Sequence, residues 1–108
     1  MKLNEYQQQA AASAIYPRDM KGVYPVLGLA GETGEVAEKV KKVIRDHGGH
    51  FSDEAKVEIA KELGDVLWYL AATAADLGFT LEEIAQLNLQ KLASRTQRGT
   101  LQGSGDNR

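Results

Sequence analysis

The chain has 108 residues, a formal net charge of −2 and no cysteine. The length predicts one domain, and the lack of cysteine excludes disulfides, zinc–thiolate sites and cysteine nucleophiles. The negative charge argues against a nucleic-acid polymer as partner, because such binding depends on a broad basic surface. No apolar run approaches the ~20 residues that span a membrane, and the polar N-terminus lacks the apolar core of a signal peptide. We therefore expect a cytoplasmic protein with no membrane partner.

Helix-forming residues dominate the composition and period-2 alternation is absent, so the sequence predicts four helices and no strand. The first helix is expected over residues 4–15, with Asn4 as its N-cap and its glutamines mostly exposed. Pro17 ends it, and a loop is expected through Pro25. The second helix is expected over residues 26–46, because two glycines follow at positions 48 and 49.

The third helix is expected to begin at Ser52 or Asp53 and to end near Asp76. Its apolar residues recur at i, i+4, i+7 and i+11 and predict a core face made of Ile59, Leu63, Val66 and Leu70. Other sides of this helix are also apolar, and three short helices supply too few neighbours to bury them. A homodimer, or a homotetramer of such dimers, would supply the missing neighbours.

A capping box of Thr80 with Glu83 opens the fourth helix, which fades near Arg95. The polar, glycine-rich residues that follow predict a flexible tail. The domain is therefore expected over residues 1–95 and the tail over residues 96–108.

Two acidic motifs, ExxE at residues 32–35 and ExxD at residues 62–65, each place two carboxylates one helical turn apart. In an antiparallel hairpin that turns near residue 50, Glu35 lies level with Asp65 and Glu38 level with Glu62. Carboxylates that converge without a basic partner repel one another unless a cation lies among them. Oxygen ligands suit Mg²⁺ or Mn²⁺, so we expect a divalent-metal site acting on a phosphate ester or anhydride.

Two glycines within the acidic motifs and a polar, basic stripe on the fourth helix are two further features of the sequence. Gly34 and Gly64 precede the second acid of each motif, and each costs about 1 kcal/mol relative to Ala inside a helix. A close approach of another helix or of a ligand would explain them. Asn88, Lys91 and Arg95 form one stripe on the fourth helix. Such a stripe is commonly a solvated basic helix end, but beside a metal–carboxylate site it predicts a polyphosphate clamp.

Residues 28–38 (GLAGETGEVAE), 61–70 (KELGDVLWYL) and 88–95 (NLQKLASR) together resemble the MazG-like nucleoside triphosphate pyrophosphohydrolases, of the all-α NTP pyrophosphatase superfamily. The resemblance extends over roughly residues 3–95. It implies an all-α fold in which a helix hairpin and flanking helices form four-helix bundles completed by a second subunit. It implies release of pyrophosphate from a nucleoside triphosphate substrate. It also implies substrate contacts from Asn88, Lys91 and Arg95, and Mg²⁺ bound by Glu32, Glu35, Glu62 and Asp65.

The expected mechanism is metal-assisted hydrolysis, in which Glu35, with Glu38 as second choice, takes the proton of the attacking water. Three alternatives stay open on the sequence. One is a phosphoribosyl-ATP pyrophosphohydrolase-like activity, and another is a non-catalytic helical interaction module. The third, a di-iron carboxylate bundle, is disfavoured because neither motif has the ExxH form.

Overall fold

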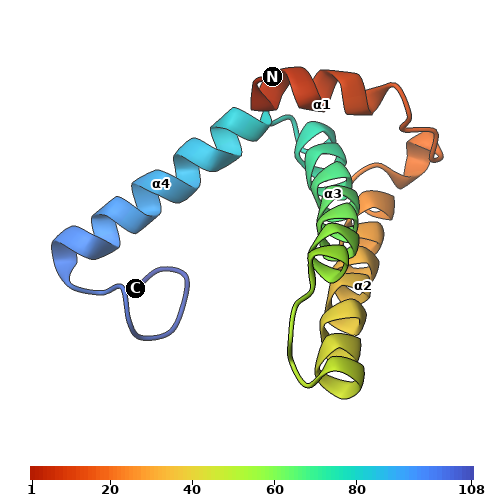
Figure 1. The fold of residues 1–108 in the computed structure, drawn as a ribbon. Coiled ribbons are helices and arrows are strands. Elements are labelled where there is room, and N and C mark those ends of the chain that lie inside the picture. Colours follow the sequence, from red (N-terminus) through yellow and green to blue (C-terminus); the bar gives the residue numbers. More distant parts are fainter.

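The structure is a computed structural model that describes residues 1–108, and it is all-α, as predicted (Figure 1). It contains four α-helices and one short 3-10 helix: α1 (Leu3–Ala11), η1 (Arg18–Met20), α2 (Tyr24–His47), α3 (Asp53–Asp76) and α4 (Leu81–Arg98). None of these helices combines the length and the apolar composition that a membrane crossing requires.

Helices α2 and α3 lie side by side as the predicted antiparallel hairpin (Figure 1). Gly48 ends α2 in the left-handed conformation (φ 59°), and the amide of Gly49 donates to the carbonyl of Val43 at 3.2 Å. This is the hydrogen bond of a glycine-terminated helix. Ser52 then caps α3 by accepting from the amide of Ala55 at 3.1 Å. The turn is therefore fixed by local sequence on both sides.

The start of α2 differs from the prediction. The helix begins at Tyr24, so Pro25 lies in its first turn and not in the preceding loop. A proline is well tolerated there, because the amides of the first turn have no partner within the helix. Pro25 is also fully buried, which anchors the beginning of the hairpin.

The close approach between the two helices occurs at Gly28. A Cβ atom on Gly28 would overlap the ring of Tyr69, whereas a Cβ on Gly34 or Gly64 would meet nothing within 4 Å. No other helix of this chain therefore approaches Gly34 or Gly64 closely, and the alternative of an approaching ligand stays a prediction. Both positions open onto free space, where a ligand or another subunit can approach the backbone.

Helix α1 is shorter than predicted and its polar residues serve another helix. It ends at Ala11 and not at Ile15, and Asn4 does not cap it. The Asn4 side chain instead accepts from the amide of Glu82 at 3.1 Å. Gln8 and Gln9 are exposed, so the glutamines are mostly exposed as predicted, but Gln7 is buried and accepts from the amide of Leu81 at 3.0 Å. Helix α1 therefore supplies hydrogen-bond acceptors that α4 needs at its first turn.

The capping box at the start of α4 is confirmed. Thr80 Oγ1 accepts from the amide of Glu83 at 3.1 Å, and the Glu83 carboxylate accepts from the amide of Thr80 at 3.0 Å. The helix continues three residues past Arg95, to Arg98, and ends at the left-handed Gly99. From the α1 contact onward, α4 extends away from the hairpin (Figure 1).

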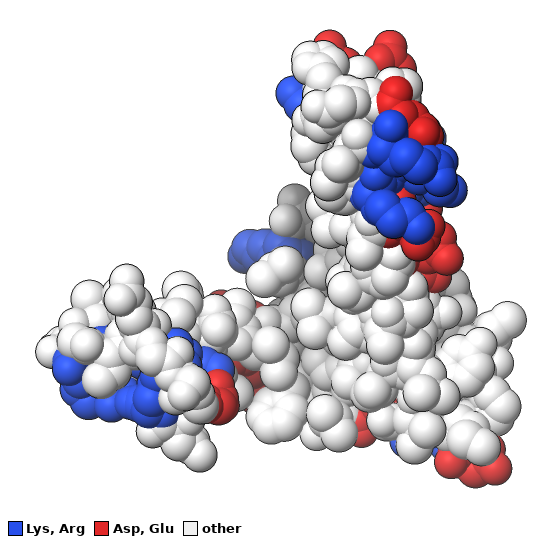
Figure 2. Space-filling model, turned by 90° about the horizontal axis from the view of Figure 1, so that it is seen from below, with Lys and Arg blue, Asp and Glu red and all other residues white.

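One chain leaves much apolar surface uncovered. Only seven of the 108 residues are buried, and Leu63 and Leu70 of the predicted core face are 52% and 36% exposed. The radius of gyration is 16.7 Å, against about 13 Å for a compact domain of this length. Figure 2 shows a broad uncharged area between the charged end of the hairpin and the extended arm.

Candidate metal and nucleotide site

Three of the four predicted metal ligands converge across the hairpin. Glu32 comes from α2, and Glu62 and Asp65 come from α3. Each offers a carboxylate oxygen, and the three oxygens lie within 4.8 Å of one another. The ligands are separated by about 30 residues of chain, so the register of the hairpin brings them together. We call these three residues the acid cluster.

The charges of the acid cluster act on one another and on a neighbouring ring. Partial burial raises the pKa of the Glu32 carboxyl above its ordinary value, and the negative charges of Asp65, Glu62 and Glu35 raise it further. Burial likewise raises the pKa of Tyr69, with smaller contributions from Tyr24, Glu32 and Asp65. A cation bound among these carboxylates would relieve the repulsion that raises the pKa of Glu32.

A basic residue lies beside the cluster, contrary to the expectation that none does. Lys39 Nζ lies 3.7 Å from a carboxylate oxygen of Glu62 and 3.9 Å from one of Glu58. Lys39 is one residue from Glu38, the position that the predicted register puts level with Glu62. The predicted register therefore already placed a lysine beside the 62–65 motif.

The remaining predicted acids lie outside the cluster. Glu35 is exposed, and it contributes to the raised pKa of Glu32. Glu38 is also exposed, and its carboxylate accepts from Lys41 Nζ at 2.8 Å. That hydrogen bond holds the pKa of Glu38 below its ordinary value. A carboxylate whose pKa is lowered in this way is a weaker base.

An open cleft adjoins the acid cluster. It is lined by Ser13, Glu32, Asp65, Trp68 and Tyr69. The indole Nε1 of Trp68 donates to Ser13 Oγ at 2.9 Å, and the Trp68 and Tyr69 rings meet edge to face at a centroid distance of 4.9 Å. These contacts fix two aromatic side chains beside the carboxylates.

The predicted phosphate-binding stripe lies elsewhere in the chain. Helix α4 carries Asn88, Lys91 and Arg95 away from the hairpin, and none of them lines the cleft beside the acids (Figure 1). Lys91 Nζ donates to the Asp106 carboxylate at 2.8 Å, and Arg95 donates to the same oxygen at 3.3 Å. The pair is thus arranged to hold one anionic group between two cations.

Residues 25–100 match the model of the MazG nucleotide pyrophosphohydrolase domain. The chain belongs to the MazG family. It is also 46% identical over 114 aligned residues to a protein named Gene 37 protein of Mycobacterium phage L5, and that alignment covers the whole of both chains. No solved structure matches the chain. The family membership confirms the resemblance expected from the sequence motifs.

The acid cluster fits the type of metal used by this family, which is generally dependent on divalent metals. Its three ligands are carboxylates, with no histidine or cysteine among them. Oxygen-only ligand sets favour hard cations such as Mg²⁺ and Mn²⁺ over zinc or copper. Glu32 and Glu62 are half-buried and Asp65 is exposed, so these three residues could hold a cation at a site that is open to solvent.

Proposed function

We propose that the chain hydrolyses (deoxy)nucleoside triphosphates to the monophosphate and pyrophosphate with Mg²⁺, or Mn²⁺, as cofactor. The observation that carries this proposal is the convergence of Glu32, Glu62 and Asp65 from two helices of a MazG domain. The physiological role would be control of nucleotide pools or removal of unwanted nucleotides.

In the proposed mechanism, Glu32, Glu62, Asp65 and, after a rotamer change, Glu35 hold the cation. When bound, the cation neutralises phosphate charge and lowers the pKa of a coordinated water. Glu35, whose exposed carboxylate contributes to the raised pKa of Glu32, would take the proton of the attacking water. Glu38 is a weaker candidate because Lys41 engages it.

We further propose that the active protein is a homodimer or a homotetramer. Leu63 and Leu70 expose apolar surface on α3, and Gly34 and Gly64 leave room beside the acidic motifs. Burying that surface against a second copy is strongly favourable, at about 25 cal/mol per Å². Assembly would also bring α4 of one protomer, with Asn88, Lys91 and Arg95, to the acid cluster of another. Lys91 and Arg95 would then stabilise the charge of the departing pyrophosphate.

Two alternatives remain as rivals. A phosphoribosyl-ATP pyrophosphohydrolase-like enzyme would use the same acid cluster on a different nucleotide. A non-catalytic helical interaction module would bind metal and gain thermal stability without turnover. Release of pyrophosphate, measured over a panel that includes standard, deoxy and modified triphosphates together with phosphoribosyl-ATP, separates all three.

The acid cluster is tested by Asp65→Asn and Glu62→Gln. Loss of groups that merely support a metal ligand typically costs 10–100-fold, so loss of a direct ligand should lower Mg²⁺-dependent pyrophosphate release by at least about 100-fold. Stabilisation by Mg²⁺ in a thermal melt should disappear in parallel. Glu54→Gln, which changes an exposed acid in the first turn of the same helix, is the matched control and should keep wild-type activity. Undiminished activity of Asp65→Asn or of Glu35→Gln would show that the site is wrongly assigned.

A further inference from the structure

Residues 99–108 fold back toward the last turns of α4 and form a closed loop (Figure 1). The amide of Thr100 donates to the carbonyl of Arg95 at 2.8 Å, so the chain leaves the helix in a tight turn. Gly103 and Gly105 have φ angles of 116° and 88°, in the region that favours glycine, and they bend the chain back. We call residues 99–108 the tail loop.

The tail loop places one carboxylate on two cations of α4. Lys91 Nζ and Arg95 both donate to the same carboxylate oxygen of Asp106, at 2.8 and 3.3 Å. Arg95 also donates to the backbone carbonyl of Asp106 at 2.6 Å. The Arg95 side chain is only 8% exposed, although α4 extends away from the other helices, whereas that of Asp106 is 76% exposed. The tail loop therefore covers the guanidinium.

The attachment of the tail loop is polar and exposed. The guanidinium of Arg108 donates to three carbonyl oxygens of the loop, at 2.8 to 3.0 Å. The carbonyl oxygen of Arg108 accepts from the Arg98 guanidinium on α4. Leu101, the one large apolar side chain of the loop, is 50% exposed. Water can replace contacts of this kind, so detaching the loop costs little.

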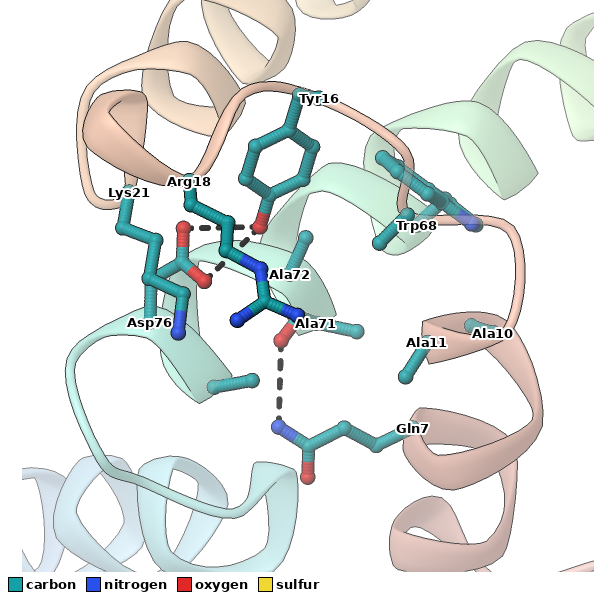
Figure 3. Close-up of a pocket in the computed structure, with 12 residues that line it drawn as sticks. Gln7, Ala10, Ala11, Tyr16, Arg18, Lys21, Trp68, Ala71, Ala72 and Asp76 are labelled. Carbon is teal, nitrogen blue, oxygen red and sulfur yellow. Dashed lines mark hydrogen bonds between the residues drawn. The ribbon is translucent and has the colours of Figure 1, made fainter.

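A carboxylate with a structural role has different surroundings in this chain. Asp76, at the end of α3, is half-buried and accepts from the Tyr16 hydroxyl and from the amide of Gly22, each at 2.9 Å. Figure 3 shows the Tyr16 contact at the wall of a cavity of about 350 Å³, where it ties the segment leading to α2 to the end of α3. Both partners of Asp76 are neutral. Asp106 is instead exposed, and both partners of its carboxylate are cations of the predicted phosphate-binding stripe.

A carboxylate and a phosphate group offer the same kind of partner to these cations. Both are anions with several acceptor oxygens, and lysine and arginine bind either of them. The hydrogen bond from Lys91 lowers the pKa of Asp106, so its carboxylate is charged at neutral pH. Lys91 and Arg95 cannot hold Asp106 and a phosphate oxygen in the same place.

We propose that the tail loop is autoinhibitory: Asp106 lies in the place of a substrate phosphate on α4, and the loop must leave Lys91 and Arg95 before a triphosphate binds there. This inference rests on the proposed function, because it concerns the basic half of the same site. A polyphosphate displaces the loop because it brings several negative charges, whereas the loop brings one carboxylate to the pair.

Binding of tripolyphosphate without metal tests the tail loop apart from catalysis. Asp106→Asn removes the competing charge and should tighten binding two- to fivefold in calorimetry, the size expected of an exposed ion pair. Asp46→Asn removes an exposed acid that is likewise bonded to an arginine, at the far end of α2, and should leave binding unchanged. Unchanged or weaker binding to Asp106→Asn would overturn the inference.

Two further variants test the position of the effect. The gain from Asp106→Asn should vanish in a chain that also carries Lys91→Met and Arg95→Met, because no cation is then left to uncover. A gain that persists there would mean that the loop acts elsewhere, against the proposal. Arg108→Gln keeps the Asp106 charge but loosens the loop, and it should tighten binding about twofold.

Movement of the loop can be observed directly. The chain has no cysteine, so Ser104→Cys, at an exposed position of the loop, provides one attachment site for a nitroxide label. Saturating tripolyphosphate should make the label more mobile in electron paramagnetic resonance, and sodium chloride at equal ionic strength should do so less. A label that stays immobile when tripolyphosphate is bound, or that is fully mobile before it is added, would overturn the inference.

The two proposals fail in different ways. If no triphosphate releases pyrophosphate but Asp106→Asn still tightens tripolyphosphate binding and the label still becomes mobile, the catalytic proposal is wrong and the autoinhibitory loop stands. If triphosphates are hydrolysed and neither measurement responds, the autoinhibitory loop is wrong and the catalytic proposal stands.

Discussion

The α2–α3 hairpin holds the acid cluster, whereas helix α4 holds the cations Lys91 and Arg95, and the two groups lie apart in one chain. The hairpin is closed by a glycine turn and by the packing of Gly28 on Tyr69, and it brings three carboxylates within 4.8 Å. Helix α4 is attached through its first turn, where Asn4 and Gln7 bind its amides, and then extends away from the hairpin. The acidic half of the candidate site is thus assembled within a chain, and the basic half is presented outward.

This difference has a physical reason. The hairpin is held by contacts along its length, because both helices have apolar faces toward each other. Beyond its first turn, α4 leaves Leu87, Leu89 and Leu92 54%, 63% and 40% exposed. A single chain therefore does not cover these apolar side chains. A basic helix with uncovered leucines and an acidic hairpin with an uncovered core face are complementary surfaces. Their association would satisfy the charges and the apolar area together.

The largest expected effect comes from mixing two impaired variants. The experiment tests whether the acid cluster of one protomer and the Lys91–Arg95 pair of another form a shared site. One chain carries Asp65→Asn, and the other carries Lys91→Met with Arg95→Met. In a two-fold dimer, a mixed pair contains one intact composite site. Random mixing should therefore recover about a quarter of the wild-type rate, measured as pyrophosphate release after co-expression.

On its own, Asp65→Asn should retain less than about 1% of the wild-type rate. The double variant Lys91→Met with Arg95→Met should retain about 10% of it. A mixture with activity no higher than the average of its two components would place both halves of the site within one chain. Native mass measured on the same samples shows whether mixed oligomers have formed, so that a failure of assembly is recognised.

The sequence predicted the hairpin well because its determinants are local. The glycines at 48 and 49, the cap at Ser52 and the capping box at Thr80 each act within a few residues. The register followed only approximately: the predicted pairing put Glu35 level with Asp65, whereas in the structure Glu32 joins Glu62 and Asp65. The predictions that failed concern side chains whose partners lie far away in the sequence.

Asn4 and Gln7 show the limit most clearly. Both lie in the first helix, where short-range patterns predicted Asn4 as the cap of that helix and did not specify which of its glutamines would be buried. The structure uses both to bind the first turn of α4, more than 70 residues away in sequence. Lys39 was missed for a similar reason, since its partner Glu62 lies on the other helix. Short-range patterns do not specify which distant backbone amide a polar side chain will meet.

Asp106 offers a smaller test of the basic half. Its carboxylate accepts from Lys91 and Arg95, and the hydrogen bond from Lys91 lowers its pKa, so it is ionised at neutral pH. In the proposed phosphate site, Asp106 would compete with a phosphate for these two cations. Asp106→Asn should lower the KM for a triphosphate about two- to fivefold at unchanged kcat, the size expected of an exposed ion pair. Asp106→Glu should behave like the wild type. A raised KM would mean that Asp106 orients Lys91 and Arg95 for substrate binding and does not compete with the substrate.

Removing the charge of Lys39 should give the smallest effect, a change in the affinity of the acid cluster for Mg²⁺. Its ammonium lies 3.7 Å from Glu62 and opposes a second cation at the same carboxylate. Lys39→Met keeps the aliphatic stem and removes the charge, so Mg²⁺ should bind about two- to fivefold more tightly, measured by titration at constant ionic strength. Lys56→Met, an exposed lysine on the first turns of α3, controls for net charge. Weaker Mg²⁺ binding in Lys39→Met alone would show that Lys39 orients Glu62 for the metal, and the acidic half would then depend on a residue that its motifs do not contain.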